Sequence, residues 1–363
     1  MPPHPGGIEG VADSLFREYR RLGHDVRWIA SREPSDAPAS EPDGRIRVPT
    51  CNLAERHLGF PWPIWGWTGV RQIRELVAWA DVMHVHDCLY LGSAVAVAIG
   101  RWTGKPVLLT QHIGDGGSRN PIVRLLHWTA NRVVGRMVLR AAAEVVAATP
   151  SGAALIEAVA GRSPIRIANG VAERFSVPTA EQRLLARRHF QLPDAVPVVL
   201  FVGRMIAQKR VDLVLAASRR LSSAVFLLVG DGPERPGSAR PPNVIHVPRL
   251  DPVEMPTAYW AADVLVLPSR GEGLPLVVQE AMASGVPVVV CGAERYASEL
   301  GGCTAVQLID PTVDSVVSGV RMALERRQTV GRVAADFAAK HWSLTAAAKE
   351  YLALLGAPGG SRR

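Results

Sequence analysis

Residues 261–290 read Ala261-Ala-Asp-Val-Leu-Val-Leu-Pro-Ser-Arg-Gly-Glu-Gly-Leu-Pro-Leu-Val-Val-Gln-Glu-Ala-Met-Ala-Ser-Gly-Val-Pro-Val-Val-Val290. Two apolar runs, Val264–Leu267 and Val286–Val290, enclose a loop rich in Gly, Pro and charge. After that loop the pattern predicts a helix that starts near Pro275 and stops at Gly285. Strands that are apolar on both faces are typical of parallel sheets covered by helices, so the stretch predicts an α/β fold.

The same alternation of strand and helix patterns continues on both sides of this stretch. In the second half it predicts six strands in the doubly wound order 3-2-1-4-5-6, at Val198–Val202, Val225–Val229, Val244–Val247, Val264–Leu267, Val286–Val290 and Thr304–Leu308. In the first half it predicts strands at Val26–Ala30, Val82–His86, Val107–Thr110, Glu144–Ala148 and Ile165–Ala168. Helices are predicted there at Ile8–Leu22, Arg71–Trp79, Leu91–Arg101, Pro121–Ala143 and Gly152–Val159.

Two features of the first half modify this prediction. The glycine-rich turn Pro2–Gly7 has no strand before it, so we expect the first sheet to lack its central strand. Pro34–Pro49 is rich in Pro, Ser and acids, and we expect a surface loop there.

A chain of 363 residues is too long for one ordinary core and fits two domains. We expect a first Rossmann-like domain over residues 1–175 and a second over residues 176–343. The segment 344–363 is predicted to form a helix that packs back toward the first domain, followed by a mobile tail.

Composition excludes several classes of protein. The hydrophobic fraction of 48% argues against disorder, and no apolar run reaches the roughly 18–20 residues of a membrane-spanning helix. The four cysteines show no metal-ligand spacing, and the start of the chain has no signal-peptide pattern, so we expect a cytoplasmic protein. The net charge of +8 is spread over both halves, which suits anionic substrates or an anionic membrane surface better than nucleic acid.

The strand order selects two loops as a candidate site. In a doubly wound sheet, ligands bind beyond the carboxyl ends of strands 1 and 4, where the order reverses. The loop after strand 1 carries Gly203, Arg204 and Lys209, and its two cations could hold a diphosphate. Its spacing is not that of a Walker A loop, and a pair of solvated surface cations is the alternative interpretation.

The loop after strand 4 leads into a helix whose N-terminus forms an anion site. Glu280 lies about one turn into that helix, where its carboxylate could accept hydrogen bonds from the hydroxyls of a ribose. Glu272, eight residues earlier, could reach the hydroxyls of a second sugar. The alternative is an ordinary helix with two surface glutamates, because this spacing alone is weak evidence.

Six motifs, spread from the N-terminus to the second half, together resemble one enzyme family. They are Arg270–Val290, Ala261–Ser269, Phe201–Arg204 with Lys209, Val229–Pro233, Pro3–Glu9 with Leu22–Val26, and Asn169–Val171. The chain is thereby similar to the retaining GT-B glycosyltransferases of glycosyltransferase family 4. The resemblance implies two Rossmann-like domains that face each other across a cleft, an acceptor side in the first domain and a nucleotide-sugar site in the second.

The resemblance also implies roles for individual residues. Arg204 and Lys209 would bind the donor diphosphate and stabilise it as it leaves, Glu280 would bind the ribose, and Glu272 would bind the transferred sugar. Further contacts to the donor would come from Gly7, Gly203, Gly273, Leu274, Leu276 and His112. Transfer would retain the anomeric configuration. A UDP-sugar is the favoured donor, a GDP-sugar is the other candidate, and no catalytic metal or other cofactor is expected.

The acceptor side carries three further patterns. Pro121–Ala143 predicts a helix with Arg124, Arg132, Arg136 and Arg140 on one face and apolar residues beside them, which fits either an anionic membrane or a solvated face. Trp62, Trp65 and Trp67 could stack on an acceptor sugar, dip into a membrane or plug their own domain. His84 and His86 are expected on opposite faces of a strand, which disfavours a shared metal.

Three functions fit these observations. The leading one is a retaining hexosyltransferase that moves a sugar to a hydroxyl acceptor in the synthesis of polysaccharides, glycolipids of the cell envelope or glycosylated metabolites. The alternatives are a nucleotide-sugar epimerase of the same fold, for which no acids are identified at the sugar ring, and a catalytically silent GT-B binding protein.

Overall fold

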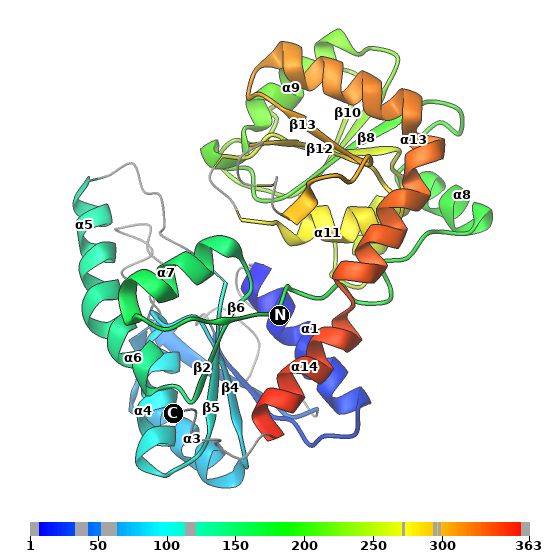
Figure 1. The fold of residues 1–363 in the computed structure, drawn as a ribbon. Helices are drawn as coiled ribbons and strands as arrows, with labels where there is room; N and C mark the ends of the chain where they lie inside the picture. The colour runs from blue at the N-terminus through cyan, green and yellow to red at the C-terminus, as the bar shows by residue number, and fades with distance from the viewer. Residues whose placement is uncertain are drawn as a thin grey trace. The chain divides into compact units, whose positions relative to one another are not determined.

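The computed structural model describes residues 7–32, 43–51, 64–112, 121–270, 273–292, 296 and 299–356. The chain divides into two compact units (Figure 1). Unit 1 comprises residues 1–170 together with 344–363, and unit 2 comprises residues 171–343. Each unit has its own parallel sheet, and each is described below by itself.

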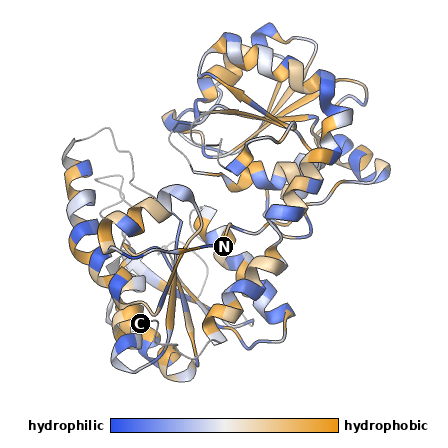
Figure 2. Cartoon of the chain, in the orientation of Figure 1, coloured by the Kyte–Doolittle hydropathy of each residue, from blue (hydrophilic) through white to orange (hydrophobic). Residues whose placement is uncertain are grey.

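Unit 2 is built on a parallel sheet of six strands in the order β10-β9-β8-β11-β12-β13. The strands are β8 (Val198–Val202), β9 (Val225–Val229), β10 (Val244–Val247), β11 (Val264–Leu267), β12 (Val288–Cys291) and β13 (Val306–Ile309). This order is the predicted 3-2-1-4-5-6. Every residue of β8, β11 and β12 is buried, and Figure 2 shows these strands as a continuous hydrophobic layer. The uninterrupted apolar runs therefore form the centre of the core.

Helices lie on both sides of this sheet (Figure 1). They are α8 (Ala180–His189), α9 (Val211–Arg220), α10 (Met255–Ala261), α11 (Leu276–Ala283) and α13 (Val313–His341), with a short 3-10 turn at Ala207–Lys209. The 29-residue α13 packs against both α9 and α11. The predicted stop at Gly285 is confirmed, since α11 ends at Ala283 and Gly285 takes a φ of +75°.

Unit 1 contains two separate sheets. Four parallel strands form one, in the order β4 (Met83–His86), β5 (Val107–Gln111), β6 (Glu144–Ala147) and β7 (Ile165–Arg166). The other consists of β1 (Trp28–Arg32), β2 (Arg45–Cys51) and β3 (Ile64–Trp65). Among the described residues no strand joins β1 to β4.

Helix α1 (Gly7–Arg21) packs against both sheets of unit 1. Its Phe16 ring lies 6.2 Å from the ring of Trp28 on β1, and its Tyr19 hydroxyl lies 3.1 Å from Nδ1 of His84 on β4. The last helix, α14 (Leu344–Gly356), packs on α1 and β5. The remaining helical elements are α3 (Trp67–Trp79), α4 (Leu91–Trp102), α5 (Pro121–Ala130), a π turn (Asn131–Gly135), α6 (Arg136–Ala141) and α7 (Pro150–Ala160).

The structure corrects the prediction of a surface loop at Pro34–Pro49. Residues 43–49 are described, and from Arg45 onward they form β2, in which Val48 is fully buried. The charged and proline-rich composition hid the period-2 alternation of a half-buried strand. The three tryptophans that the sequence groups together do not share one environment. Trp65 packs into the core of unit 1, Trp67 is 85% exposed, and Trp62 lies outside the described residues.

Candidate functional site

The loop after β8 is shaped by a glycine and a lysine. Gly203 has a φ of +153°, and a Cβ placed on it would lie 3.5 Å from Cε of Lys209. The positive φ favours glycine at this position, and the Lys209 side chain lies at van der Waals distance from it, above the end of the strand. Arg204 is exposed and Lys209 is partly buried at the end of the 3-10 turn. Both cations therefore lie at the carboxyl end of β8.

The loops after β8 and β11 are hydrogen-bonded to each other. The backbone N–H of Arg270 donates to the carbonyl oxygen of Gln208 at 2.9 Å, and Nε2 of Gln208 donates to the carbonyl oxygen of Arg270 at 3.0 Å. The loop after β9 joins them, because the N–H of Met205 donates to the carbonyl oxygen of Asp231 at 2.8 Å. The two loops selected from the strand order thus meet at one edge of the sheet.

Helix α11 begins immediately after the second loop. Pro275 is its N-cap residue and supplies no side-chain cap, and Leu276 is its first helical residue. The N-terminus of α11 follows Gly273 and Leu274, with Leu274 buried. A helix start that lacks a side-chain cap presents backbone N–H groups and a partial positive charge, which favour an anion.

Glu280 is the fifth residue of α11, and its carboxylate is held from the neighbouring helix. The hydroxyl of Tyr259 on α10 donates to Oε2 of Glu280 at 2.6 Å. Burial raises the pKa of Glu280, while the Tyr259 hydrogen bond and the nearby Arg174 oppose that rise. Burial also raises the pKa of Tyr259 well above its ordinary value, so its hydroxyl keeps its proton and remains the donor. A carboxylate has four lone-pair positions, and one hydrogen bond leaves room for two sugar hydroxyls.

Sequence reasoning missed Tyr259 and Arg174. Tyr259 is fully buried, and its ring packs edge-on against Phe175 with 5.7 Å between the centroids. The Arg174 guanidinium lies 4.9 Å from the centroid of the same Phe175 ring. No motif marks these positions, because the contacts bring residues 174–175, Tyr259 of α10 and Glu280 of α11 together across the fold, and spacing along the chain does not specify this.

The remaining predicted site residues are Glu272, Gly7 and His112. Glu272 lies outside the described residues. Gly7, in unit 1, is the exposed first residue of α1 and so stands at a helix N-terminus. His112, also in unit 1, directly follows β5 and is 8% exposed. Its backbone N–H donates to Oδ1 of Asp87 at 2.8 Å.

His112 belongs to a cluster of three histidines. Its Nε2 lies 3.0 Å from Nδ1 of His86, and the rings of His86 and His84 lie 4.5 Å apart. Burial is the main cause that lowers the pKa of all three, to about 4 for His86, so the rings are neutral at pH 7. The expectation that His84 and His86 point to opposite faces is wrong: residues two apart on a strand share a face.

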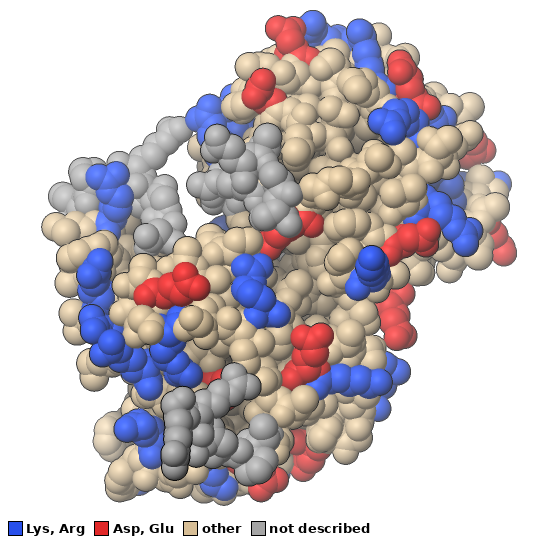
Figure 3. Space-filling view, viewed as in Figure 1, with Lys and Arg blue, Asp and Glu red and all other residues tan. Residues whose placement is uncertain are grey.

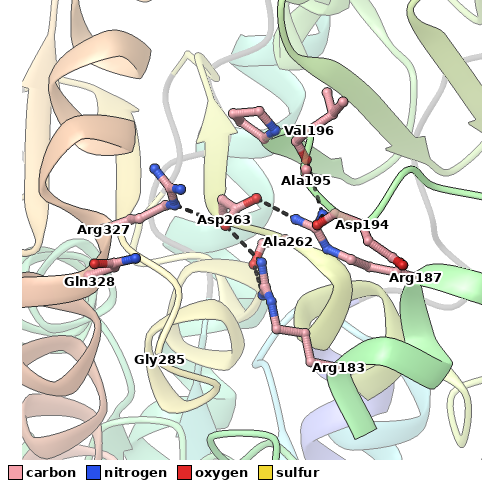
Figure 4. A pocket seen from close by; sticks show the side chains of 11 residues that line it. Arg183, Arg187, Asp194, Ala195, Val196, Ala262, Asp263, Gly285, Arg327 and Gln328 are labelled. Carbon is pink, nitrogen blue, oxygen red and sulfur yellow. Dashed lines mark hydrogen bonds and ion pairs between the residues drawn. The ribbon is translucent and has the colours of Figure 1, made fainter. Parts of the chain in front are cut away.

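The pocket in Figure 4 lies at the opposite edge of the unit 2 sheet. Asp263 immediately precedes β11 and accepts hydrogen bonds from Arg183 and Arg187, each at 2.7 Å, and from the N–H of Val198 at 2.8 Å. Arg327 of α13 lies 3.2 Å from the same carboxylate. These groups line a pocket of about 340 Å³. The network ties α8 and α13 to the amino ends of the strands, away from the loops described above.

No group of three or more His, Cys, Asp or Glu side chains in the described part of the chain is arranged to hold a metal ion. No helix among these residues has the length and apolar character that crossing a membrane requires.

Comparison with known proteins assigns the family. Residues 196–325 match the model of glycosyl transferases group 1, and residues 5–175 match the model of glycosyltransferase family 4. A GDP-mannose-dependent alpha-mannosyltransferase of Mycobacterium tuberculosis is 30% identical over 305 residues, which cover 79% of this chain and 75% of the relative. A protein of the same description from Mycolicibacterium smegmatis is 31% identical over 323 residues, covering 84% and 81%.

Solved structures agree on the fold. HepE of Anabaena in complex with UDP-glucose has a TM-score of 0.73 at 15% identity, covering 98% of this chain and 97% of that one. WaaG, a glycosyltransferase involved in lipopolysaccharide biosynthesis, has a TM-score of 0.66 at 16% identity, with 98% of both chains covered. The sequence matches and the shared fold together show that the chain belongs to the group 1, family 4 glycosyltransferases and has the GT-B fold.

Proposed function

We propose that the protein transfers a sugar from a nucleotide diphosphate sugar to a hydroxyl group of an acceptor, with retention of the anomeric configuration. The observation that carries this proposal is the joining of two loops at the carboxyl edge of the unit 2 sheet through Gln208 and Arg270. That contact groups the cations of one loop with the α11 N-terminus that follows the other, and both favour a diphosphate.

Each residue then has a role in donor binding. Arg204 and Lys209 bind the diphosphate, helped by the backbone N–H groups around Gly273, Leu274 and Leu276. Gly203 supplies the backbone conformation, with a φ of +153°, that turns the loop at the end of β8. Glu280 accepts hydrogen bonds from the ribose hydroxyls.

The remaining roles concern the transferred sugar. Glu272 and His112 bind its hydroxyls, and Gly7 offers the N-terminus of α1 to the phosphates. The neutral His112 suits hydrogen bonding to a hydroxyl rather than charge pairing.

The reaction breaks the bond between the anomeric carbon and the diphosphate oxygen and forms a bond from that carbon to the acceptor oxygen. The acceptor proton passes to the departing phosphate, so the two events occur on the same face of the sugar. The contribution of the protein is to position both substrates and to stabilise the negative charge on the leaving group through Arg204 and Lys209. The proposed reaction uses no metal ion.

The names of the two mycobacterial relatives support guanine as the base of the donor nucleotide. Both are named as GDP-mannose-dependent, which makes GDP-mannose the first donor to test, before the UDP-sugars that the sequence motifs favoured. The acceptor is proposed to be a hydroxyl of a growing polysaccharide, a glycolipid or a small metabolite, used on the cytoplasmic side of the membrane.

Donor binding can be tested by thermal shift with GDP-mannose, UDP-glucose and dTDP-glucose. The true donor should raise the melting temperature more than the others, because a ligand stabilises the folded state by mass action. Glu280→Gln retains an oxygen that can accept from Tyr259 but removes the charge, so it should weaken donor binding by about 10- to 100-fold. Glu325→Gln, at an exposed glutamate of α13, is the matched control. An unchanged shift in the Glu280 variant would refute the ribose assignment.

Incubation with the same donors separates the three candidate functions. Slow release of nucleoside diphosphate and free sugar supports a transferase, and an altered nucleotide sugar supports an epimerase. Binding with neither product supports a silent protein. Retention can be read from the one-bond carbon–proton coupling at the anomeric carbon of the transferred sugar in an NMR spectrum, which distinguishes the two anomers of mannose as well as those of glucose.

A further inference from the structure

The helical segment from Pro121 to Ala141 carries an unusual amount of exposed apolar surface. It runs through α5, the π turn and α6 without a break. Six of the fifteen large exposed apolar side chains found on the described chain lie in these 21 residues. They are Leu125, Leu126, Trp128, Val133, Val134 and Met137, with exposed fractions from 42% to 68%. Apolar groups gathered in this way mark a surface that binds something.

The inward face of the segment explains why these side chains stay outside. Asn131, Gly135, Val138 and Leu139 are buried, and a Cβ on Gly135 would lie 3.3 Å from Sγ of Cys88 in the core. The π turn brings both Asn131 and Gly135 to the buried side, so α5 and α6 rest on unit 1 along one common face. Between Arg124 and Arg140 the opposite face is exposed to solvent.

The exposed face is also strongly basic. Arg124, Arg132, Arg136 and Arg140 are all exposed, and the sequence has no acid between Ser118 and Ala143. Figure 3 shows Lys and Arg side chains along the edge of unit 1 formed by α5 and α6. The Arg132 guanidinium lies 5.0 Å from the centroid of the Trp128 ring, so charge and aromatic surface are interleaved.

The two kinds of side chain form neighbouring stripes. Leu126, Val133 and Met137 are separated by seven and four residues, and Arg132 and Arg136 by four, so each set follows one side of the helix. An apolar stripe next to a purely cationic one is complementary to a bilayer surface, where acyl chains lie just below anionic phosphates. An acidic protein groove would offer charge without the extended apolar layer.

We propose that the exposed face of the 121–141 segment docks on an anionic membrane surface, with the apolar stripe entering the interface and the arginines contacting lipid phosphates. The proposal is independent of the donor assignment, because it concerns a surface of unit 1 and needs no catalysis. It places a glycosyltransferase at the surface where lipid-linked hydroxyl acceptors would be found.

Sedimentation with vesicles tests this directly. The purified protein should bind vesicles of phosphatidylcholine with 30% phosphatidylglycerol, and bind pure phosphatidylcholine at least about tenfold more weakly. High salt should weaken binding to the anionic vesicles. Equal binding to both kinds of vesicle, or binding to neither, would overturn the proposal.

Two double variants separate the contributions of the stripes. Arg132→Gln with Arg136→Gln should weaken binding by about 30-fold, because each basic residue near an anionic surface contributes about fivefold. Leu126→Ser with Met137→Ser should weaken it by at least about tenfold. The matched control, Arg321→Gln with Arg326→Gln, replaces two exposed arginines of α13 in unit 2 and should bind as the parent does.

Light scattering completes the test. Unaltered vesicle binding by both α5–α6 double variants would show that another surface carries the interaction. A dimer that dissociates when Leu126 and Met137 are changed would show that the face pairs with a second copy instead. All variants alter exposed side chains, so unchanged melting temperatures verify that the fold persists.

Discussion

Acid should destabilise unit 1 through its buried histidines, and His86 gives the size of the effect. The pKa of His86 is lowered to about 4, against 6.5 for an ordinary histidine. As the pH falls below 6.5, His86 becomes protonated in the unfolded chain, whereas in the folded protein it stays neutral until about pH 4. His86 therefore does not reduce the free energy of unfolding above pH 6.5, and it reduces that free energy progressively as the pH falls toward 4.

The two pKa values fix the expected magnitude. Between pH 7 and pH 5, His86 alone should reduce the free energy of unfolding by about 1.8 kcal/mol, or increase the unfolded population about 20-fold. Burial lowers the pKa of His84 and of His112 as well, and the neighbouring His86 lowers both further, so they add to the loss. The 3.0 Å contact between His86 and His112 reinforces this, because two protonated rings would repel there.

Hydrogen exchange is the suitable assay, because the two units need not unfold together. Peptides that cover β4 and β5 report opening of unit 1, and their rates at pH 7 and pH 5 are corrected for intrinsic exchange. His86→Gln should remove about 1.8 kcal/mol of the difference between the two pH values, while His24→Gln, at an exposed histidine, should leave it unchanged. The reasoning fails if opening is independent of pH, or if the His86 variant keeps the full pH dependence of the parent.

Three further changes test unit 2. Tyr259→Phe removes the hydrogen bond to Glu280 and should raise the donor Kd about fivefold in calorimetry; an unchanged Kd would contradict the positioning role. Asp263→Asn leaves the buried Arg187 without its countercharge and should cost about 3–5 kcal/mol in urea unfolding, and a loss below about 1 kcal/mol would show that the network is not structural. Gly230→Ala, at a φ of +137°, would push a Cβ into the backbone of the loop after β8. This variant should lower the free energy of unfolding, measured in urea, by at least about 2 kcal/mol and should raise the donor Kd. Unchanged stability and unchanged Kd would show that this loop can adjust.

The sheet of unit 2 could be predicted closely because backbone rules determine it. Each of its strands is an apolar run bounded by Gly, Pro or charge, and the fixed handedness of parallel crossovers limits the possible strand orders. The same rules located the loop that carries Arg204 and Lys209 next to the loop that leads to Glu280. In unit 1 the same rules predicted fewer of the strands. Strand β2 (Arg45–Cys51) was missed because a half-buried strand with charged outer residues resembles a polar loop.

Contacts between side chains of different helices and strands could not be predicted from the sequence. The histidine cluster draws on β4 and on the end of β5, and its close packing depends on the register in which His86 pairs with Thr110. The pairing of Tyr259 with Glu280 likewise depends on the packing of α10 against α11. Spacing along one segment specifies neither the register nor the packing, so such contacts have no local signature.

Two carboxylates at opposite ends of the unit 2 strands, Asp263 and Glu280, have different surroundings and therefore suit different roles. Asp263 contacts three guanidinium groups and a backbone N–H, which neutralise its charge and hold helices to the strands. The short hydrogen bond to Glu280 comes instead from a neutral hydroxyl, which orients the carboxylate without cancelling its charge. Burial raises the pKa of Glu280, so this charge is costly and is best stabilised by further hydroxyl donors. A donor ribose supplies such hydroxyls, and donor affinity should therefore fall as the pH is lowered and Glu280 takes up a proton.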